Sequence, residues 1–235
     1  MEDNTTLTVD SPFAIRHSSF DQWLLWQLAD SAFPTGGFAH SSGLEGAWQH
    51  GEVRNRNELL SFVEAGLHQL GRAALPFMNA AYVEPESVDE FDNLCDAFTT
   101  NHVANRASRA QGKAFLATVQ RVFVANVETD RMPVLRFNHL ACVFGAAMRQ
   151  LEISRETARQ LFFFNQLRGI MAAAVRLNIV GPMEAQALQR QLTPVAEEVL
   201  NRCESLTLED IAQTSPLLDM WQGAQDRLYS RLFQS

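Results

Sequence analysis

The sequence predicts an all-α protein, a single-domain bundle of many helices. Apolar residues recur at helical spacing in nearly every segment after Phe20. Sustained period-two alternation is missing, and the only β-leaning piece, 134–137, is too short to form a sheet. A chain of 235 residues is long enough to bury a sizeable core without a disulfide or a structural metal. We therefore expect one domain over residues 19–235, preceded by a flexible arm at 1–18.

The first predicted helix runs from about Phe20 to Phe33. Its apolar face consists of Trp23, Leu24, Leu28 and Ala32. Pro34 disfavours the helical conformation at the residue before it, so we expect the helix to end there. Ser42 and Glu45 then stand in the S-x-x-E arrangement of a capping box, which predicts that a second helix begins at Ser42.

The later helices are indicated by the same kinds of signal. A third apolar stripe contains Leu59, Leu60, Val63, Leu67 and Leu70. Ser87 and Glu90 form another potential capping box, and Ser154 is predicted to cap a helix that runs through Val175. Pro182 and Pro194 predict helix boundaries or kinks inside the domain.

Two features predict close helix packing. A stripe of small residues follows the predicted helix 103–124: Val103, Ala107, Ala110, Ala114 and Ala117. Small side chains let a second helix approach closely, either in the core or in a homodimer. The run from Leu161 to Phe164 is bulky on every side, which predicts a helix that is buried on most of its faces.

Charge and composition exclude several classes of protein. With 19 basic and 27 acidic residues, the chain has a formal charge of −8, which argues against binding of nucleic acid. We expect the acidic run from Glu84 to Asp96 to face solvent. Lys113 is the only lysine, and the excess of arginine indicates either a chain with protein partners or a codon bias. Scattered cysteines, the lack of a secretory signal and the lack of long apolar runs predict a cytoplasmic protein without membrane contact.

Signatures of catalytic sites are missing. The glycine-rich stretch from Gly36 to Gly43 lacks the glycine spacing and the lysine of a nucleotide-binding P-loop. Ser42 is not flanked by the glycines of a nucleophile elbow. The six histidines show no zinc-ligand spacing, so we interpret each as structural, with His40 and His50 the only weak candidates for a metal ligand.

The glycine-rich loop has two interpretations. Gly36 and Gly37 permit backbone angles closed to other residues, and Phe38 is then free to fill a pocket and lock a tight corner between helices. Alternatively, a glycine loop that leads into a helix N-terminus can hold an anion.

At this loop the sequence resembles a known family. The run from Leu28 to Glu45 is similar to the signature of the urease accessory protein F family. Three further stretches match that family in order: 105–112, 173–186 and 228–235. The chain departs from the family at Gln225-Asp226, where His-Glu is frequent, which weakens any argument for a metal-binding tail.

The resemblance implies a non-enzymatic scaffold in urease maturation. Such proteins are all-α homodimers that bridge an accessory protein of the D or H type, which binds apo-urease, and a nickel-carrying GTPase of the G type, whose activity they are proposed to regulate. Nickel would be cargo of the complex, and no tightly bound cofactor is expected. The residues that we expect to bind partners are Gly36, Gly37, Phe38, His40, Ser41, Glu45, Arg106, Ser108, Gln111, Arg176, Tyr229, Arg231 and Phe233.

The C-terminal residues 221–235 are expected to form a partner-binding tail. A helix predicted over Asp226–Phe233 would place Leu228, Leu232 and Phe233 together, and this face could lie in a groove on a partner or on its own domain. Two alternative functions stay open at this point. One is a metallochaperone that binds nickel through His40, His50 or a cysteine, and the other is an uncharacterised helical-bundle enzyme.

Overall fold

The computed structural model describes residues 22–123 and 135–235, and within these ranges the chain is helical without any strand. The predicted arm at 1–18 lies outside the described residues. The helices are α1 (Gln22–Ala29), α2 (Leu44–Gln49), α3 (Arg56–Gln69), α4 (Leu75–Val83), α5 (Val88–Phe98), α6 (His102–Phe123), α7 (Leu140–Gln150), α8 (Arg155–Arg176), α9 (Pro182–Cys203) and α10 (Pro216–Ala224). In the described parts, no helix has both the length and the apolar character needed to cross a membrane.

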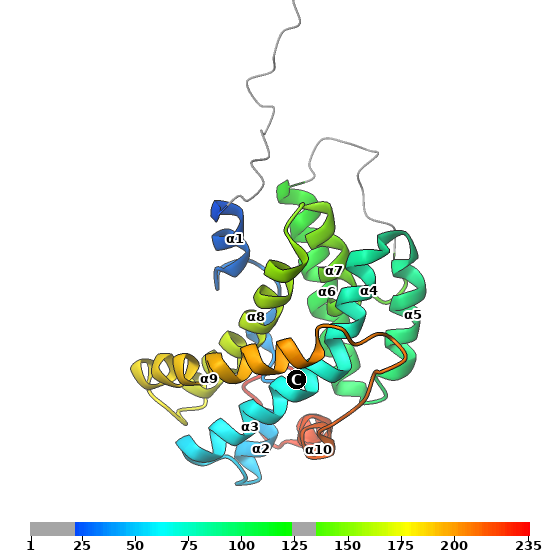
Figure 1. The fold of residues 1–235 in the computed structure, drawn as a ribbon. Coiled ribbons are helices and arrows are strands. Elements are labelled where there is room, and N and C mark those ends of the chain that lie inside the picture. The colour runs from blue at the N-terminus through cyan, green and yellow to red at the C-terminus, as the bar shows by residue number, and fades with distance from the viewer. Residues whose placement is uncertain (1–21, 124–134) are drawn as a thin grey trace, which may run out of the picture.

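The helices pack around α7, which contacts both α4 and α6. Helix α5 lies against α4 and α7, while α8 packs against α9, which in turn crosses α3 (Figure 1). Helix α10 lies against α2 and α6 at the other end of the molecule from α1 (Figure 1). One cluster of buried apolar side chains extends from Leu28 in α1 to Phe233 near the C-terminus, so both ends of the described chain contribute to the same core.

Two glycines allow the closest helix contacts. A Cβ atom on Gly145 of α7 would lie 2.1 Å from the carbonyl oxygen of Met78 in α4. A Cβ on Gly112 of α6 would lie 1.9 Å from the carbonyl oxygen of Asn138. Neither distance is possible for real atoms, so α7 can pack this closely against α4 and α6 only with glycine at these positions.

The small-residue stripe predicted on α6 is only partly in the core. Val103 and Ala107 are buried, whereas Ala110 and Ala117 are exposed. The buried face of α6 instead carries larger side chains, among them Phe115 and Val119. The bulky run in α8 is buried as predicted from Leu161 to Phe163, and Phe164 is 39% exposed.

Helix caps were predicted correctly in one case of three. Ser154 caps α8, since its hydroxyl accepts a hydrogen bond from the Thr157 amide at 3.2 Å. At Ser87 the predicted helix start is correct, since α5 begins after this residue, but the predicted capping box is wrong, because the Ser87 side chain forms no capping hydrogen bond. The capping box of Ser42 and Glu45 is also wrong. Gly43 precedes α2, and Ser41 rather than Ser42 accepts a hydrogen bond from the Glu45 amide, at 3.3 Å.

Helix α1 ends at Ala29, earlier than the predicted end at Phe33. The Asp30 carboxylate accepts a hydrogen bond from the Ala32 amide at 2.7 Å, which favours a turn over a further helical turn. Phe33 is the aromatic anchor of this corner. Its ring is buried and lies 6.0 Å from the Phe115 ring, measured between centroids.

A polar cluster inside the bundle corrects the expectation that the whole acidic run faces solvent. Asp92 is fully buried, and its carboxylate accepts hydrogen bonds from the amides of Phe137, Asn138 and His139 at 2.8, 2.9 and 2.7 Å. It therefore fixes the backbone that leads into α7. The buried His139 ring contacts the Ser108 hydroxyl and the Asp96 carboxylate, both at 3.2 Å, which confirms for this residue the prediction of a structural histidine.

Cys95 of α5 joins this cluster. Hydrogen bonds from Cys142 and His139 lower the pKa of the Cys95 thiol to about 6, although burial opposes the shift. The same thiol contact, together with burial, raises the pKa of Cys142. Burial lowers the pKa of His139, but its contacts with Cys95 and Asp96 outweigh burial, so that its pKa is raised overall.

We therefore predict one thiolate in the folded protein at neutral pH. Titration followed by the ultraviolet absorbance of the thiolate should show a step near pH 6 that Cys95→Ser removes and Cys203→Ser leaves in place. Because the pKa of this acid is lower in the folded state, the stability it contributes is complete above the unfolded value of 9.0 and is lost as the pH falls toward 6. A titration without this step, or one unchanged in Cys95→Ser, would contradict the prediction.

Candidate functional site

The helix predicted over Asp226–Phe233 is wrong. The chain forms a short 3-10 turn at Gln225–Arg227 and then becomes extended at Leu228, with φ −66 and ψ 135. Beyond this point the amides of Leu232 and Phe233 bond to Glu45 of α2, and the Gln234 amide and the Ser235 carbonyl bond to the glycine-rich loop. Tertiary hydrogen bonds therefore replace the helical ones. The tail packs on its own domain, one of the two placements that the sequence leaves open.

The loop and the tail are joined by their backbones. The Ser41 amide donates a hydrogen bond to the Ser235 carbonyl at 2.6 Å, and the Gln234 amide donates to the Ala39 carbonyl at 2.8 Å. We call the region formed by residues 36–45, 225–235 and Arg176 the loop–tail clasp. Gly36 begins the loop with φ 73, and Ser42 and Gly43 follow with φ 54 and φ 86. These left-handed conformations turn the chain back toward α2.

Glu45 is the buried centre of the clasp, with 1% of its surface exposed. One carboxylate oxygen accepts a hydrogen bond from the Leu232 amide at 2.6 Å. The other accepts from the Phe233 amide at 3.1 Å and from the Gln225 side chain at 2.6 Å. A buried carboxylate is stable when several donors surround it, and here all three donors belong to the tail.

Arg176, near the end of α8, closes the clasp from the other side. Its guanidinium carbon lies 3.9 Å from the centre of the Phe38 ring and 4.0 Å from the centre of the Phe233 ring. The same group donates hydrogen bonds to the carbonyls of Phe38 and Leu232. One ring belongs to the loop and the other to the tail, so the arginine holds both.

Phe38 does not fill a pocket as predicted. Its ring is 72% exposed and is covered on one face by Arg176, whereas Phe233 is 4% exposed. Tyr229 and Leu232 are also exposed at the tail, Tyr229 completely and Leu232 by 52%. The clasp thus presents apolar side chains to solvent above a backbone that buried polar groups hold in place.

Asp226 connects the tail to α6. Its carboxylate accepts hydrogen bonds from the Arg106 guanidinium at 2.8 and 3.1 Å. His102 and Arg231 approach the same carboxylate at 3.2 and 3.4 Å. The Arg106 guanidinium, helped by His102, holds the pKa of Asp226 below its usual value. Arg106 and Arg231 are both among the residues that the resemblance implies. They pair with the same carboxylate, that of Asp226, which is not among them.

The two histidines considered as metal ligands make protein contacts. The Nδ1 atom of His40 lies 2.5 Å from the Ser235 hydroxyl, and that of His50 lies 2.8 Å from the Gly46 carbonyl. Burial, together with the charge of Arg106, lowers the pKa of His40. In the two described stretches, no group of three or more His, Cys, Asp or Glu side chains is placed to hold a metal ion.

Most of the residues expected to bind partners lie in the clasp or contact it. Gly37 lies beside Gln111, since a Cβ on this glycine would be 3.5 Å from the Gln111 side-chain oxygen. Ser108 is the exception, because its hydroxyl accepts a hydrogen bond from the Leu140 amide and so joins α6 to α7. Sequence reasoning missed Gln225 and treated Gln225-Asp226 only as a departure from the family. No local pattern marks either residue, because their partners lie far away along the chain.

A cavity of about 440 Å³ lies beneath the loop. Its walls come from the loop and from six helices, and among the side chains that line it are Phe33, Cys95, Gln111, Asn165, Arg176 and Phe233. The side-chain oxygen of Asn165 is buried there without a hydrogen-bond partner. The clasp therefore covers a partly polar interior space.

These features define an all-helical protein in which buried polar groups hold a loop and a tail together at the surface. The UreF family model matches residues 53–193. Urease accessory protein F of Arabidopsis thaliana is 39% identical over 228 residues, which cover 94% of this chain and 95% of the relative. The protein of the same name from Oryza sativa subsp. indica is 38% identical over 220 residues, 90% of this chain and 84% of the relative. Urease accessory protein UreF of Trichodesmium erythraeum is 26% identical over 227 residues, which cover 91% of this chain and 96% of the relative.

The chain therefore belongs to the UreF family of urease accessory proteins, which act in urease maturation and are not catalytic enzymes. The family model covers neither the glycine-rich loop nor the C-terminal tail, because it begins at residue 53 and ends at residue 193. The alignments with the plant relatives cover at least 90% of the chain.

Proposed function

We propose that this protein is a cytoplasmic scaffold that bridges the apo-urease-binding accessory protein of the D or H type and the nickel-carrying GTPase of the G type. Nickel is the cargo of that assembly. The observation that supports this proposal is the exposed face of the loop–tail clasp. Phe38, Tyr229 and Leu232 present apolar surface there, and Arg106, Arg176 and Arg231 lie beside them. Aromatic and arginine side chains are typical of the centres of protein interfaces.

The rigidity of the clasp favours binding. The tail is tied to the body by Glu45, by Arg176 and by backbone hydrogen bonds, so the backbone that carries its exposed side chains is held in place before a partner arrives. A partner then has little conformational entropy to remove when it binds. We assign the D- or H-type protein to this face.

We predict that the double substitution Tyr229→Ala and Leu232→Ala weakens binding of the D- or H-type protein about tenfold or more. Both side chains are exposed, so the unfolding midpoint should stay close to that of the unmodified protein. Co-purification and calorimetric titration with the D- or H-type protein measure the effect. These point substitutions test the tail more cleanly than truncation after Gly223, because truncation would also leave Glu45 without its donors.

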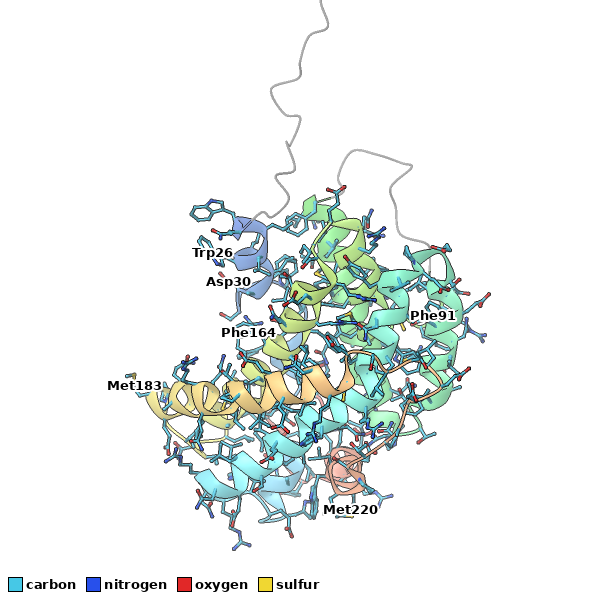
Figure 2. All side chains as sticks on the ribbon, viewed as in Figure 1. Trp26, Asp30, Phe91, Phe164, Met183 and Met220 are labelled. Atoms are coloured by element: carbon cyan, nitrogen blue, oxygen red, sulfur yellow. The ribbon has the colours of Figure 1, made fainter. Side chains whose placement is uncertain are left out.

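The matched control is Met183→Ala. This side chain is 86% exposed and stands at the outer end of α9, on an element outside the clasp (Figure 2). It should leave partner binding unchanged. If the tail substitutions bind as tightly as this control, the tail is not the docking surface. If the unmodified protein binds neither partner, and a strain without it still makes nickel-loaded urease, the scaffold proposal is wrong.

A further inference from the structure

A second surface, separate from the clasp, carries mostly positive charge. A groove of about 830 Å³ runs between α6 and residues 136–138, which lead into α7. Among the described residues that line it, the cations are Arg106, Arg109, Lys113 and Arg136, and the only carboxylate is that of Asp96. We call this the basic groove. It has an excess of three positive charges in a chain whose formal charge is −8.

The charges of the basic groove are only partly compensated from within the protein. Asp226, outside its lining, pairs with Arg106 at 2.8 Å, and Asp96 lies 3.8 Å from Arg109. Within residues 22–123 and 135–235, neither Lys113 nor Arg136 forms an ion pair. No acidic group of the described residues therefore pairs with these two cations.

The wall opposite α6 is held in place. The guanidinium carbons of Arg109 and Arg136 lie 4.9 and 5.0 Å from the centre of the Phe137 ring. This ring keeps two like charges near each other and fixes their directions. The backbone beneath it is bound by the buried Asp92 carboxylate, through the amides of Phe137 and Asn138. The basic groove thus has ordered donors before any ligand binds.

The spacing of the cations favours a row of carboxylates. Arg106, Arg109 and Lys113 follow one another along α6 at helical spacing, so they extend over about 10 Å of the helix axis. A single phosphate group needs donors that converge on one point, whereas these donors are spread along a line. A nucleic acid is disfavoured as well, because it would extend beyond the groove over the rest of a chain whose formal charge is −8.

We propose that the basic groove docks an acidic segment of a partner protein, with arginines binding its carboxylates and Lys113 lying next to them. Guanidinium groups bind carboxylates through bidentate hydrogen bonds, and donors that are already in position reduce the entropy cost of binding. The basic groove lies outside the proposed clasp surface except for Arg106 at its edge, so this docking does not depend on the clasp being the site of the D- or H-type protein.

The single lysine makes the proposal testable on the isolated full-length protein. The probe is a fluorescent oligoglutamate peptide, compared with an oligoglutamine peptide, at low ionic strength. Binding is followed by fluorescence anisotropy, and carbodiimide coupling then joins a bound carboxylate to a neighbouring amine. We expect the oligoglutamate peptide alone to bind and to couple at Lys113 rather than at the N-terminal amine, as located by mass spectrometry.

Three variants separate the basic groove from general charge attraction. Arg136→Gln should weaken oligoglutamate binding about tenfold. Arg190→Gln changes the total charge equally on the exposed face of α9 and should leave binding unchanged. Lys113→Arg keeps the charge, so it should retain binding and abolish the coupling.

Three results would overturn the proposal. One is equal affinity of the Arg136→Gln and Arg190→Gln variants for the oligoglutamate peptide, and another is coupling only at the N-terminal amine. The third is tighter binding of inorganic tripolyphosphate than of oligoglutamate, with the same sensitivity to Arg136→Gln, which would make the ligand a phosphate instead. None of these results bears on the scaffold proposal, because neither maturation partner is present in the experiment.

Discussion

Glu45→Ala is expected to release the C-terminal tail from the domain. The substitution removes the acceptor for the amides of Leu232 and Phe233 and for the Gln225 side chain, and it leaves those donors at a site where water is scarce. Buried donors without partners each cost on the order of 1–3 kcal/mol, and bonds to charged groups are among the stronger ones. We therefore expect a loss of roughly 3 kcal/mol in the free energy of unfolding, measured by urea denaturation.

The tail itself provides a second measurement of this effect. Carboxypeptidase should remove the C-terminal residues of Glu45→Ala faster than those of the unmodified protein, in which Ser235 is 1% exposed. Glu64→Ala is the matched control, because Glu64 is exposed on α3 and no hydrogen bond or ion pair involving it is formed among the described residues. Equal rates of digestion and equal stability in the two variants would show that Glu45 does not hold the tail.

Gly145→Ala is expected to disrupt the packing of α7 against α4. The added methyl group would lie 2.1 Å from the Met78 carbonyl oxygen and 3.1 Å from the Tyr82 amide nitrogen, both of which are backbone atoms of α4. Backbone in a packed core cannot move aside as a flexible side chain can, so the two helices must separate. We expect a loss of roughly 3 kcal/mol in the free energy of unfolding, despite the higher helix propensity of alanine.

Gly169→Ala makes the same chemical change in a different environment. Gly169 lies within α8, and nothing is within 4 Å of a Cβ added there. Without a clash, the better helix propensity of alanine should raise the stability by roughly 0.5–1 kcal/mol. Thermal and urea unfolding of the two variants should therefore shift in opposite directions. If both shift the same way, close approach of α4 and α7 is not what requires glycine at position 145.

The helices could be predicted from the sequence because their signals are local. Apolar spacing along α3 and α8 follows from the geometry of the helix itself, and the Ser154 cap depends on an amide only three residues away. The cap predicted at Ser42 failed although its pattern is equally good. There the Glu45 side chain is taken by the tail, and the chain reaches α2 through left-handed residues at Ser42 and Gly43.

Several residues of the clasp, among them Glu45 and Arg176, could be identified by resemblance, whereas their arrangement could not. Glu45 and Gln225 are 180 positions apart, and Arg106 and Asp226 are 120 apart. No periodicity links such pairs. Nothing in the sequence therefore indicates that the Glu45 carboxylate accepts three hydrogen bonds from the tail, or that Asp226 pairs with two arginines and a histidine. The same holds for Asp92, which lies in an acidic run that looks solvent-facing and is fully buried.

The sequence by itself determined that this chain is helical, that it lacks a recognisable catalytic signature and that it resembles urease accessory protein F, because these follow from spacing, composition and motif order. Only the tertiary structure decided that the tail is extended rather than helical, that Phe38 is exposed while Phe233 is buried, and that the cations of α6 line a groove. Those outcomes depend on which distant groups compete for each hydrogen bond. A buried carboxylate with three tail donors outweighs the preference of eight residues for a helix.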